Sequence, residues 1–238
     1  MKCYYDFHIH TALSPCADND MTPNNIIGMA KLKGLDIIAI TDHNTAKNVE
    51  AVMTCAKNTD IIVVPGMEVE TAEEVHVLCL FPDLQSALRL QELVYENLPT
   101  LDNRVDIFGE QIIVDEKDVI KGYEERMLVT ACALSVQKVK EKTEALGGVI
   151  MPAHINRQAY SIISNLGFIP PELGVKYVEV SLKVANEQAI INSKDFSGLH
   201  IMYNSDAHHL GDISERQYNI DLNKKSITHL FKTFKLKK

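Results

Sequence analysis

The sequence predicts a fold of the α/β class, with parallel strands that alternate with helices and that we expect to close into a barrel. Three observations support this. Short apolar runs recur along all 238 residues, helical patterns lie between several of them, and polar residues follow the runs directly. A hydrophobic content of 46% and a charged content of 24% are ordinary for a soluble globular protein. The length suits one large domain.

The expected strands are seven runs that are continuously apolar, as in strands covered on both faces. They read "YYDFHI", "LDIIAI", "DIIVVP", "VHVLCLF", "GVIMPAH", "KYVEVSL" and "LHIMYN".

Helices are expected between several of these runs. The first has Thr22 as its N-cap and Pro23 in the first position, and it ends at Gly34. A second helix is predicted within 45–58, and a third within 128–148, where it closes on two glycines.

Two regions depart from this alternation. Residues 83–147 are predicted to form a mostly helical insertion or cap near the substrate mouth of a single domain that spans 1–238. The C-terminal stretch places apolar residues on one helical face, which predicts a docked helix. These residues are Ile227, Leu230, Phe231 and Phe234.

Composition limits where the protein works and what it binds. The five cysteines are scattered without disulfide spacing, which favours free thiols in a reducing compartment, and we expect a cytoplasmic protein. No run approaches the roughly 20 apolar residues of a membrane span. The net charge of −8 argues against a protein that coats long nucleic acid. No pattern indicates an oligomeric state.

Imidazoles and carboxylates gather where the expected strands end. The carboxyl ends of parallel barrel strands share one mouth, so these side chains should converge. Six of the nine histidines belong to this set, and two neighbouring acids, Asp42 and Glu70, are expected to orient histidines by hydrogen bonds. The main members are His8, His10, His43, Glu68, His76, His154, Asp206 and His208.

This mixture of ligands indicates transition metals. Histidine with carboxylate suits zinc, manganese or iron, whereas calcium and magnesium usually take oxygen ligands. Six histidines and two carboxylates exceed the three protein ligands of one catalytic zinc ion, so the sequence predicts two or three divalent metals.

The same motifs, in the same order, resemble the PHP (polymerase and histidinol phosphatase) family of metal-dependent phosphoesterases. The resemblance covers about residues 4–208 and rests on "DFHIHT", "ITDHN", "PGMEVE", "VHVLCLF", "PAHINR" and "NSDAH". It implies a distorted seven-stranded (β/α)7 barrel with a trinuclear metal centre.

The resemblance also implies how the ligands divide. His8, His10, Glu68 and Asp206 would hold the first metal, with Glu68 bridging to a second that is completed by His76 and His154. A third metal would take His43, His208 and one residue of the loop after His10. Here the chain departs from the family pattern, because Pro15 stands where many members have aspartate. Asp18, Cys16 and Asp20, in that order, are the candidates.

The predicted activity is hydrolysis of a phosphate ester by a metal-bound hydroxide at a di- or trinuclear centre. Arg157 and Arg216 could bind phosphate oxygens, and His209 could protonate the leaving oxygen. The expected substrate is a small phosphomonoester, such as a nucleotide, a sugar phosphate or an amino-alcohol phosphate. Two alternatives stay open: an exonuclease or 3′-phosphatase acting on short oligonucleotides or nucleotide bisphosphates, and a metal-binding regulatory module that has lost activity.

Overall fold

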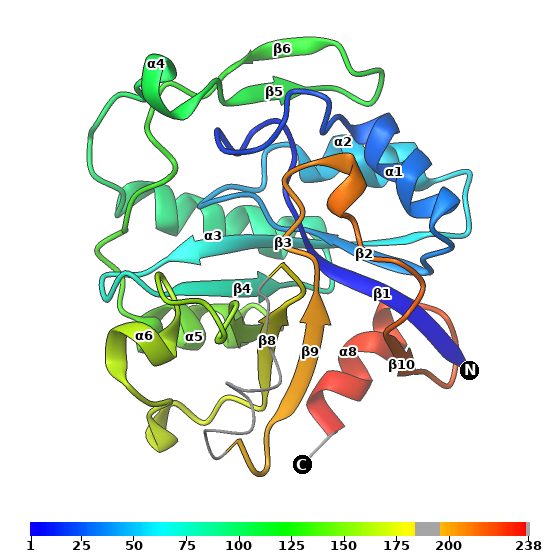
Figure 1. Cartoon of the computed structure of the whole chain (residues 1–238), viewed down its shortest axis with the longest axis vertical. Coiled ribbons are helices and arrows are strands. Elements are labelled where there is room, and N and C mark those ends of the chain that lie inside the picture. The colour runs from blue at the N-terminus through cyan, green and yellow to red at the C-terminus, as the bar shows by residue number, and fades with distance from the viewer. Residues whose placement is uncertain (184–195, 237–238) are drawn as a thin grey trace.

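The computed structural model describes residues 1–183 and 196–236, and these form an α/β fold around a curled sheet (Figure 1). Six strands pair in the order β10-β1-β2-β3-β4-β7. Their bounds are Lys2–Ile9 (β1), Ile37–Ile40 (β2), Ile62–Glu70 (β3), His76–Leu80 (β4), Val149–Pro152 (β7) and Asn219–Asp221 (β10).

The sheet is not purely parallel, contrary to our expectation. Strands β1, β2 and β3 are parallel, but β4 pairs antiparallel with both β3 and β7, and β10 pairs antiparallel with β1. For β3 and β4 the reason is the length of their connection. Only residues 71–75 join them, whereas a parallel neighbour needs a crossover of a dozen or more residues.

The seven predicted strands all form, but not as one continuous sheet. Strands β8 (Tyr177–Ser181) and β9 (His200–Asn204) make a separate parallel pair. Single contacts connect this pair to its neighbours. Ile155 N–H donates to the Glu179 carbonyl, and Ile9 forms an isolated bridge with Ala207. The curled half-barrel therefore agrees with the expected fold, whereas a closed seven-stranded barrel is not confirmed.

Helices cover both faces of the curled sheet. The larger apolar core packs strands against α1 (Pro23–Leu32), α2 (Val49–Ala56), α3 (Leu84–Glu96) and α5 (Val136–Ala145). The second core lies against α8 (Ile227–Leu236), whose Leu230, Phe231 and Phe234 are buried as predicted for a docked helix. Consecutive residues of β2 alternate between the two cores, which explains why the run is continuously apolar.

Local sequence signals mark where two of the predicted helices begin. Thr22 holds the N-cap position of α1 without a side-chain capping hydrogen bond, Pro23 is the first residue of the helix, and Gly34 follows it with a positive φ of 69°. The helix predicted from residue 128 instead begins at Val136, because the Ser135 side chain accepts a hydrogen bond from Lys138 N–H and caps it there.

The segment 83–147 is only partly helical. Between α3 and α5 it contains the short α4 (Val105–Phe108) and a hairpin of β5 (Ile112–Val114) and β6 (Ile120–Tyr123), which lies at the top of Figure 1. The remaining short elements are α6 (Ile162–Leu166) and two 3-10 turns, η1 (Pro171–Leu173) and η2 (Leu210–Asp212).

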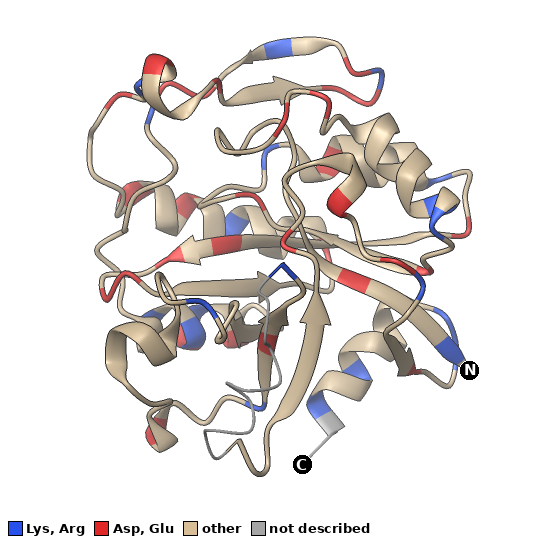
Figure 2. Cartoon of the chain, viewed as in Figure 1, with Lys and Arg blue, Asp and Glu red and all other residues tan. Residues whose placement is uncertain are grey.

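Charge is not confined to the surface. Figure 2 shows acidic positions within β1 and β3, and Asp6, Glu68 and Glu70 of these strands are buried.

Within the described ranges, no helix has the length and apolar content needed to cross a membrane.

Candidate metal centre

The eight histidines and carboxylates predicted to converge do lie together. They come from the ends of β1 and β3, the start of β4, and the residues that follow β2, β7 and β9. Several of them border a cavity of about 510 Å³ that opens to solvent. Its lining is Cys16, His43, Glu68, Glu70, His76, Val129, Arg157, Tyr160, Ser181, Lys183, Asp206 and His208.

Glu68 is at the centre of the cluster. Its Oε1 lies 3.0 Å from both His76 Nδ1 and His154 Nε2, and 3.4 Å from His8 Nε2. Its Oε2 lies 3.0 Å from His43 Nδ1 and 3.5 Å from His10 Nε2. One carboxylate therefore faces two groups of imidazoles, as a bridging ligand between two cations would.

His8 at the end of β1 and His10 just after it point the same nitrogen, Nε2, at each other. The Ser14 hydroxyl donates its only proton to Asp42 Oδ1, so it must accept from His10 Nδ1–H at 2.9 Å. This leaves a lone pair on His10 Nε2. His8 Nδ1 lies 2.9 Å from Glu179 Oε2. This contact turns the other ring nitrogen of His8, Nε2, toward the cluster, where it lies 3.0 Å from His10 Nε2.

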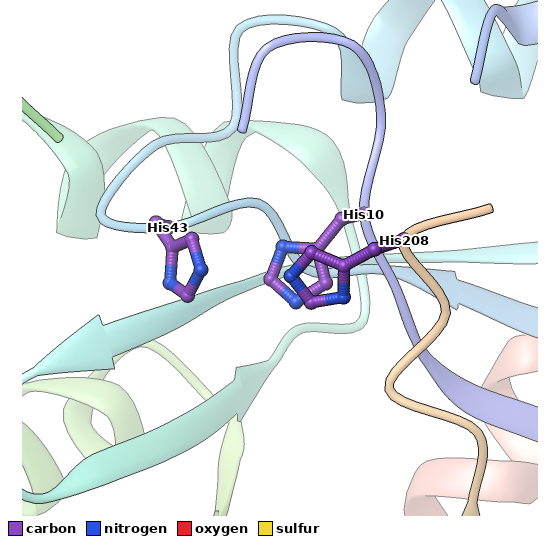
Figure 3. A group of neighbouring side chains, drawn as sticks. All are labelled: His10, His43 and His208. Carbon is purple, nitrogen blue, oxygen red and sulfur yellow. The ribbon is translucent and has the colours of Figure 1, made fainter. Parts of the chain in front are cut away.

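His10, His43 and His208 form a further group of ligand atoms (Figure 3). The rings of His10 and His208 stack with centroids 4.1 Å apart, and His43 lies 4.6 Å from His10. Cys16 borders the same part of the cavity. Desolvation acts to raise the pKa of its thiol, but the neighbouring imidazoles of His43 and His208 lower that pKa to about 6.

Two of these residues adopt a backbone conformation that L-amino acids rarely take. His154 has φ 29° and Asp206 has φ 53°, both in the left-handed region. Such strain persists only where the surroundings hold it, and it concentrates at functional sites. Both lie just beyond a strand end, His154 after β7 and Asp206 after β9.

Mutual electrostatics shift the protonation equilibria in the cluster. Burial acts to lower the pKa of His8, but the carboxylates of Glu179, Glu68 and Asp206 raise it well above its ordinary value. Burial, together with the imidazoles of His208 and His43, holds the pKa of His10 well below its ordinary value. Burial acts to raise the pKa of Glu68 and of Asp206, but the surrounding histidines hold both well below the ordinary range.

The five remaining candidates lie in different places. Arg157 borders the cavity, and its Nη1 donates to Asp206 Oδ2 at 3.0 Å. Asp18 is exposed, and its carboxylate lies 3.4 Å from Nδ1 of the equally exposed His209. Asp20 is exposed as well. Arg216 does not line the cavity. Its guanidinium lies over the Tyr4 ring, 4.1 Å from the centroid, near the start of β1, so its placement does not support a role with substrate.

The two acids expected to orient histidines are both close to the cluster. Asp42 acts through Ser14, which connects it to His10. The Glu70 carboxylate lies 3.7 Å from His76 Nε2.

Sequence reasoning missed Glu179. This carboxylate is fully buried in β8, where it contacts His8 Nδ1 and accepts from His154 N–H and Asn204 Nδ2. The signal was available, because Glu179 is an acid in the middle of the apolar run "KYVEVSL", and a buried carboxylate needs partners. Tyr160 and Lys183, which line the cavity, carried no comparable signal.

Comparison with known families now identifies the chain. The PHP domain profile matches residues 6–157, which is more than half of the sequence. The chain belongs to the PHP domain family.

Individual relatives match only part of the chain. Uncharacterized protein MJ1587 of Methanocaldococcus jannaschii is 35% identical over 98 residues, which are 37% of this chain and 57% of that protein. A 5′-3′ exoribonuclease of Haemophilus influenzae is 26% identical over 100 residues, 39% of this chain and 35% of that enzyme.

Among solved structures, the fold of this chain is similar to that of the lesion-specific endonuclease PfuEndoQ of Pyrococcus furiosus. The similar region covers 99% of this chain and 56% of the endonuclease chain. The TM-score is 0.70 and the sequence identity 20%, which shows a shared fold. The match thus covers between about a third and little more than half of the length of each of these proteins.

PHP proteins are metal-dependent, and the side chains here fit metal ions. Glu68 Oε2 and His154 Nδ1 are buried and make no hydrogen bond among the described residues. Three groups of ligand atoms each lie within 4.8 Å of one another, and all of them are histidine nitrogens or Glu68 oxygens. Converging lone pairs of this kind repel one another unless a cation lies between them.

Proposed function

We propose that this PHP protein hydrolyses small phosphomonoesters with two or three divalent transition metals, zinc, manganese or iron. The observation that supports this best is the position of Glu68 between two groups of imidazoles, beside a cavity that can admit a small substrate. Metal ions bound here would lower the pKa of water and neutralise phosphoryl oxygens. We propose the cytoplasm as the location, in keeping with five unpaired cysteines.

In this proposal the ligands divide as the family resemblance implies. His8, His10, Glu68 and Asp206 hold one metal, and Glu68 with His76 and His154 holds a second. His43 and His208 hold a third together with Cys16, which we prefer to Asp18 because the Cys16 thiol borders the cavity and the Asp18 carboxylate is directed to His209. A thiolate in this position favours zinc.

Arg157 is the residue that we propose to hold phosphate. It gives one N–H to Asp206, and its remaining donors suit phosphoryl oxygens next to the cluster. Lys183 also lines the cavity, with its ammonium 3.1 Å from the Asp212 carboxylate. We propose that Arg157 orients the substrate through its phosphate oxygens, beside the metals.

A short oligonucleotide is the second candidate substrate. It is favoured by the relative named as a 5′-3′ exoribonuclease and by the opening of the cavity to solvent. The phosphate would occupy the same place beside the cluster in both cases.

The test is phosphate release by the protein loaded separately with Zn²⁺, Mn²⁺ or Fe²⁺. The substrates are a nucleotide, a sugar phosphate, an amino-alcohol phosphate and a short RNA. We expect turnover with at least one metal, and a loss of about 10²-fold or more in Glu68→Gln. Purified protein that neither contains nor takes up metal would overturn the proposal.

A further inference from the structure

Tyr160 presents an aromatic ring beside the candidate metal centre. Its ring stacks on His76, with centroids 4.9 Å apart and planes 25° apart. The residue is nonetheless 44% exposed and borders the cavity. One side of the ring is therefore supported by a residue of the cluster while much of the side chain remains open to a ligand.

The loop that carries Tyr160 is tied down at several points. The backbone carbonyl of Tyr160 accepts a hydrogen bond from His76 N–H at 2.9 Å, and Arg157 N–H donates to the His154 carbonyl. The Ser161 hydroxyl donates to the Arg157 carbonyl and also caps α6. The ring is thus held in place before a ligand arrives, which lowers the entropic cost of using it for binding.

The backbone of Tyr160 is strained. Its φ of 57° lies in the left-handed region, which is unusual for a bulky residue. An exposed tyrosine that served only to cover surface would gain nothing from this conformation. A strained residue at the edge of a site indicates that its orientation matters.

We propose that Tyr160 is a stacking platform that selects substrates in which a flat ring system is attached to the phosphate-bearing part. In chemical terms this is a nucleoside phosphate, either free or at the end of a short strand. The phosphate would lie at the cluster near Arg157 while the base covers Tyr160. This inference rests on the proposed function and specifies the substrate class of the same site.

The experiment compares adenosine 5′-monophosphate with ribose 5-phosphate, which has the same sugar and phosphate but no base. We expect the metal-loaded protein to prefer the nucleotide in kcat/KM. Tyr160→Ala should lower the ratio of kcat/KM for the nucleotide to kcat/KM for ribose 5-phosphate by roughly tenfold, since base–aromatic stacking is worth about 5- to 150-fold in binding. Tyr160→Phe should retain the preference.

Tyr123→Ala is the matched control, because Tyr123 is similarly exposed at 51% but lies on β6, outside the cavity lining. It should behave like the unaltered protein. A short oligoribonucleotide with a 5′-phosphate serves as a third substrate. A larger Tyr160 effect on this strand than on the free nucleotide would identify the terminal base of a strand as the ligand of the platform.

Calorimetric titration of adenosine 5′-monophosphate separates this inference from the proposed function. Binding that weakens about tenfold in Tyr160→Ala without any hydrolysis would uphold the platform and reject the hydrolase. Hydrolysis with the same nucleotide-to-ribose-phosphate ratio in all variants would overturn the platform and uphold the hydrolase. Nucleotide binding that does not depend on Tyr160 would likewise overturn it.

Discussion

At the scale of single residues, the site depends on side chains that position the proposed ligands. Glu179 contacts His8 with both oxygens and accepts from the backbone of His154, so one buried carboxylate orients two ligands. Ser14 and Asp42 do the same for His10. A carboxylate behind a ligating imidazole fixes its tautomer and raises its basicity.

Replacing Glu179 with Gln should therefore weaken metal binding by about 10- to 100-fold, because an amide neither favours the Nδ1–H tautomer of His8 as strongly nor raises its basicity. Competition titration with a chromophoric chelator measures this directly. Glu172→Gln, an exposed change in the η1 turn, is the matched control and should leave the affinity unchanged. Equal affinities in the two variants would reject the role of Glu179.

The loop after β1 offers a second test at this scale. Cys16→Ala should remove one equivalent of metal per chain, whereas Asp18→Asn should retain the full complement, because only Cys16 borders the cavity. Elemental analysis of the two purified variants gives the stoichiometry. If instead Asp18→Asn loses the metal, the order of preference given by the family pattern is the right one.

At the scale of secondary-structure elements, α8 supports β1, the strand that carries His8 and leads into His10. Phe234 packs edge-on against Phe7, with centroids 5.8 Å apart, and against Tyr177 at 5.1 Å. Phe7 precedes His8, and Tyr177 lies in the same strand as Glu179. The helix thus fixes the two strands that carry His8 and Glu179.

Phe234→Ala should lower the free energy of unfolding by about 3–5 kcal/mol, the usual cost of removing a buried aromatic ring. Urea denaturation followed by circular dichroism measures the change. Lys232→Ala, an exposed change on the same helix, should stay within about 0.5 kcal/mol of the original protein. A similar small effect for Phe234→Ala would show that α8 does not support the sheet.

At the scale of the whole molecule, the cluster makes the stability of the metal-free protein depend on pH. The pKa values of Glu68 and Asp206 are held well below their ordinary values in the folded state, despite burial, by the histidines around them. In the unfolded chain these groups titrate near ~4. Their contribution to stability is thus fully present above about pH 4 and is lost as the pH falls through the lowered folded values.

We therefore expect the unfolding free energy of the metal-free protein to fall steadily below about pH 4. Urea denaturation at a series of pH values between 5 and 2.5 measures the slope. The slope should be shallower in Glu68→Gln, which lacks one of the two groups. An unfolding free energy that does not change over this pH range would show that the pKa values of Glu68 and Asp206 are not lowered in the folded protein.

Much of the molecule follows from local sequence. All seven expected strands form, α1 begins and ends at its predicted signals, and α8 docks through its predicted apolar face. The spacing of apolar residues and the signals for helix ends are properties of residues close together in the sequence, so they can be recognised from the chain alone. The direction of β4 was also implied by a short connection, although alternation of strands and helices had suggested a parallel sheet.

The sequence by itself determined the family, the set of imidazoles and carboxylates, and their order at the strand ends, because these depend on residue type and spacing. Only the tertiary structure decided which of them meet. It placed Glu68 between two groups of histidines, brought Glu179 behind His8, directed Asp18 to His209, and moved Arg216 away to Tyr4. The contact between Arg216 and Tyr4 joins residues 212 positions apart, and all of these distances are set by how strands and loops pack.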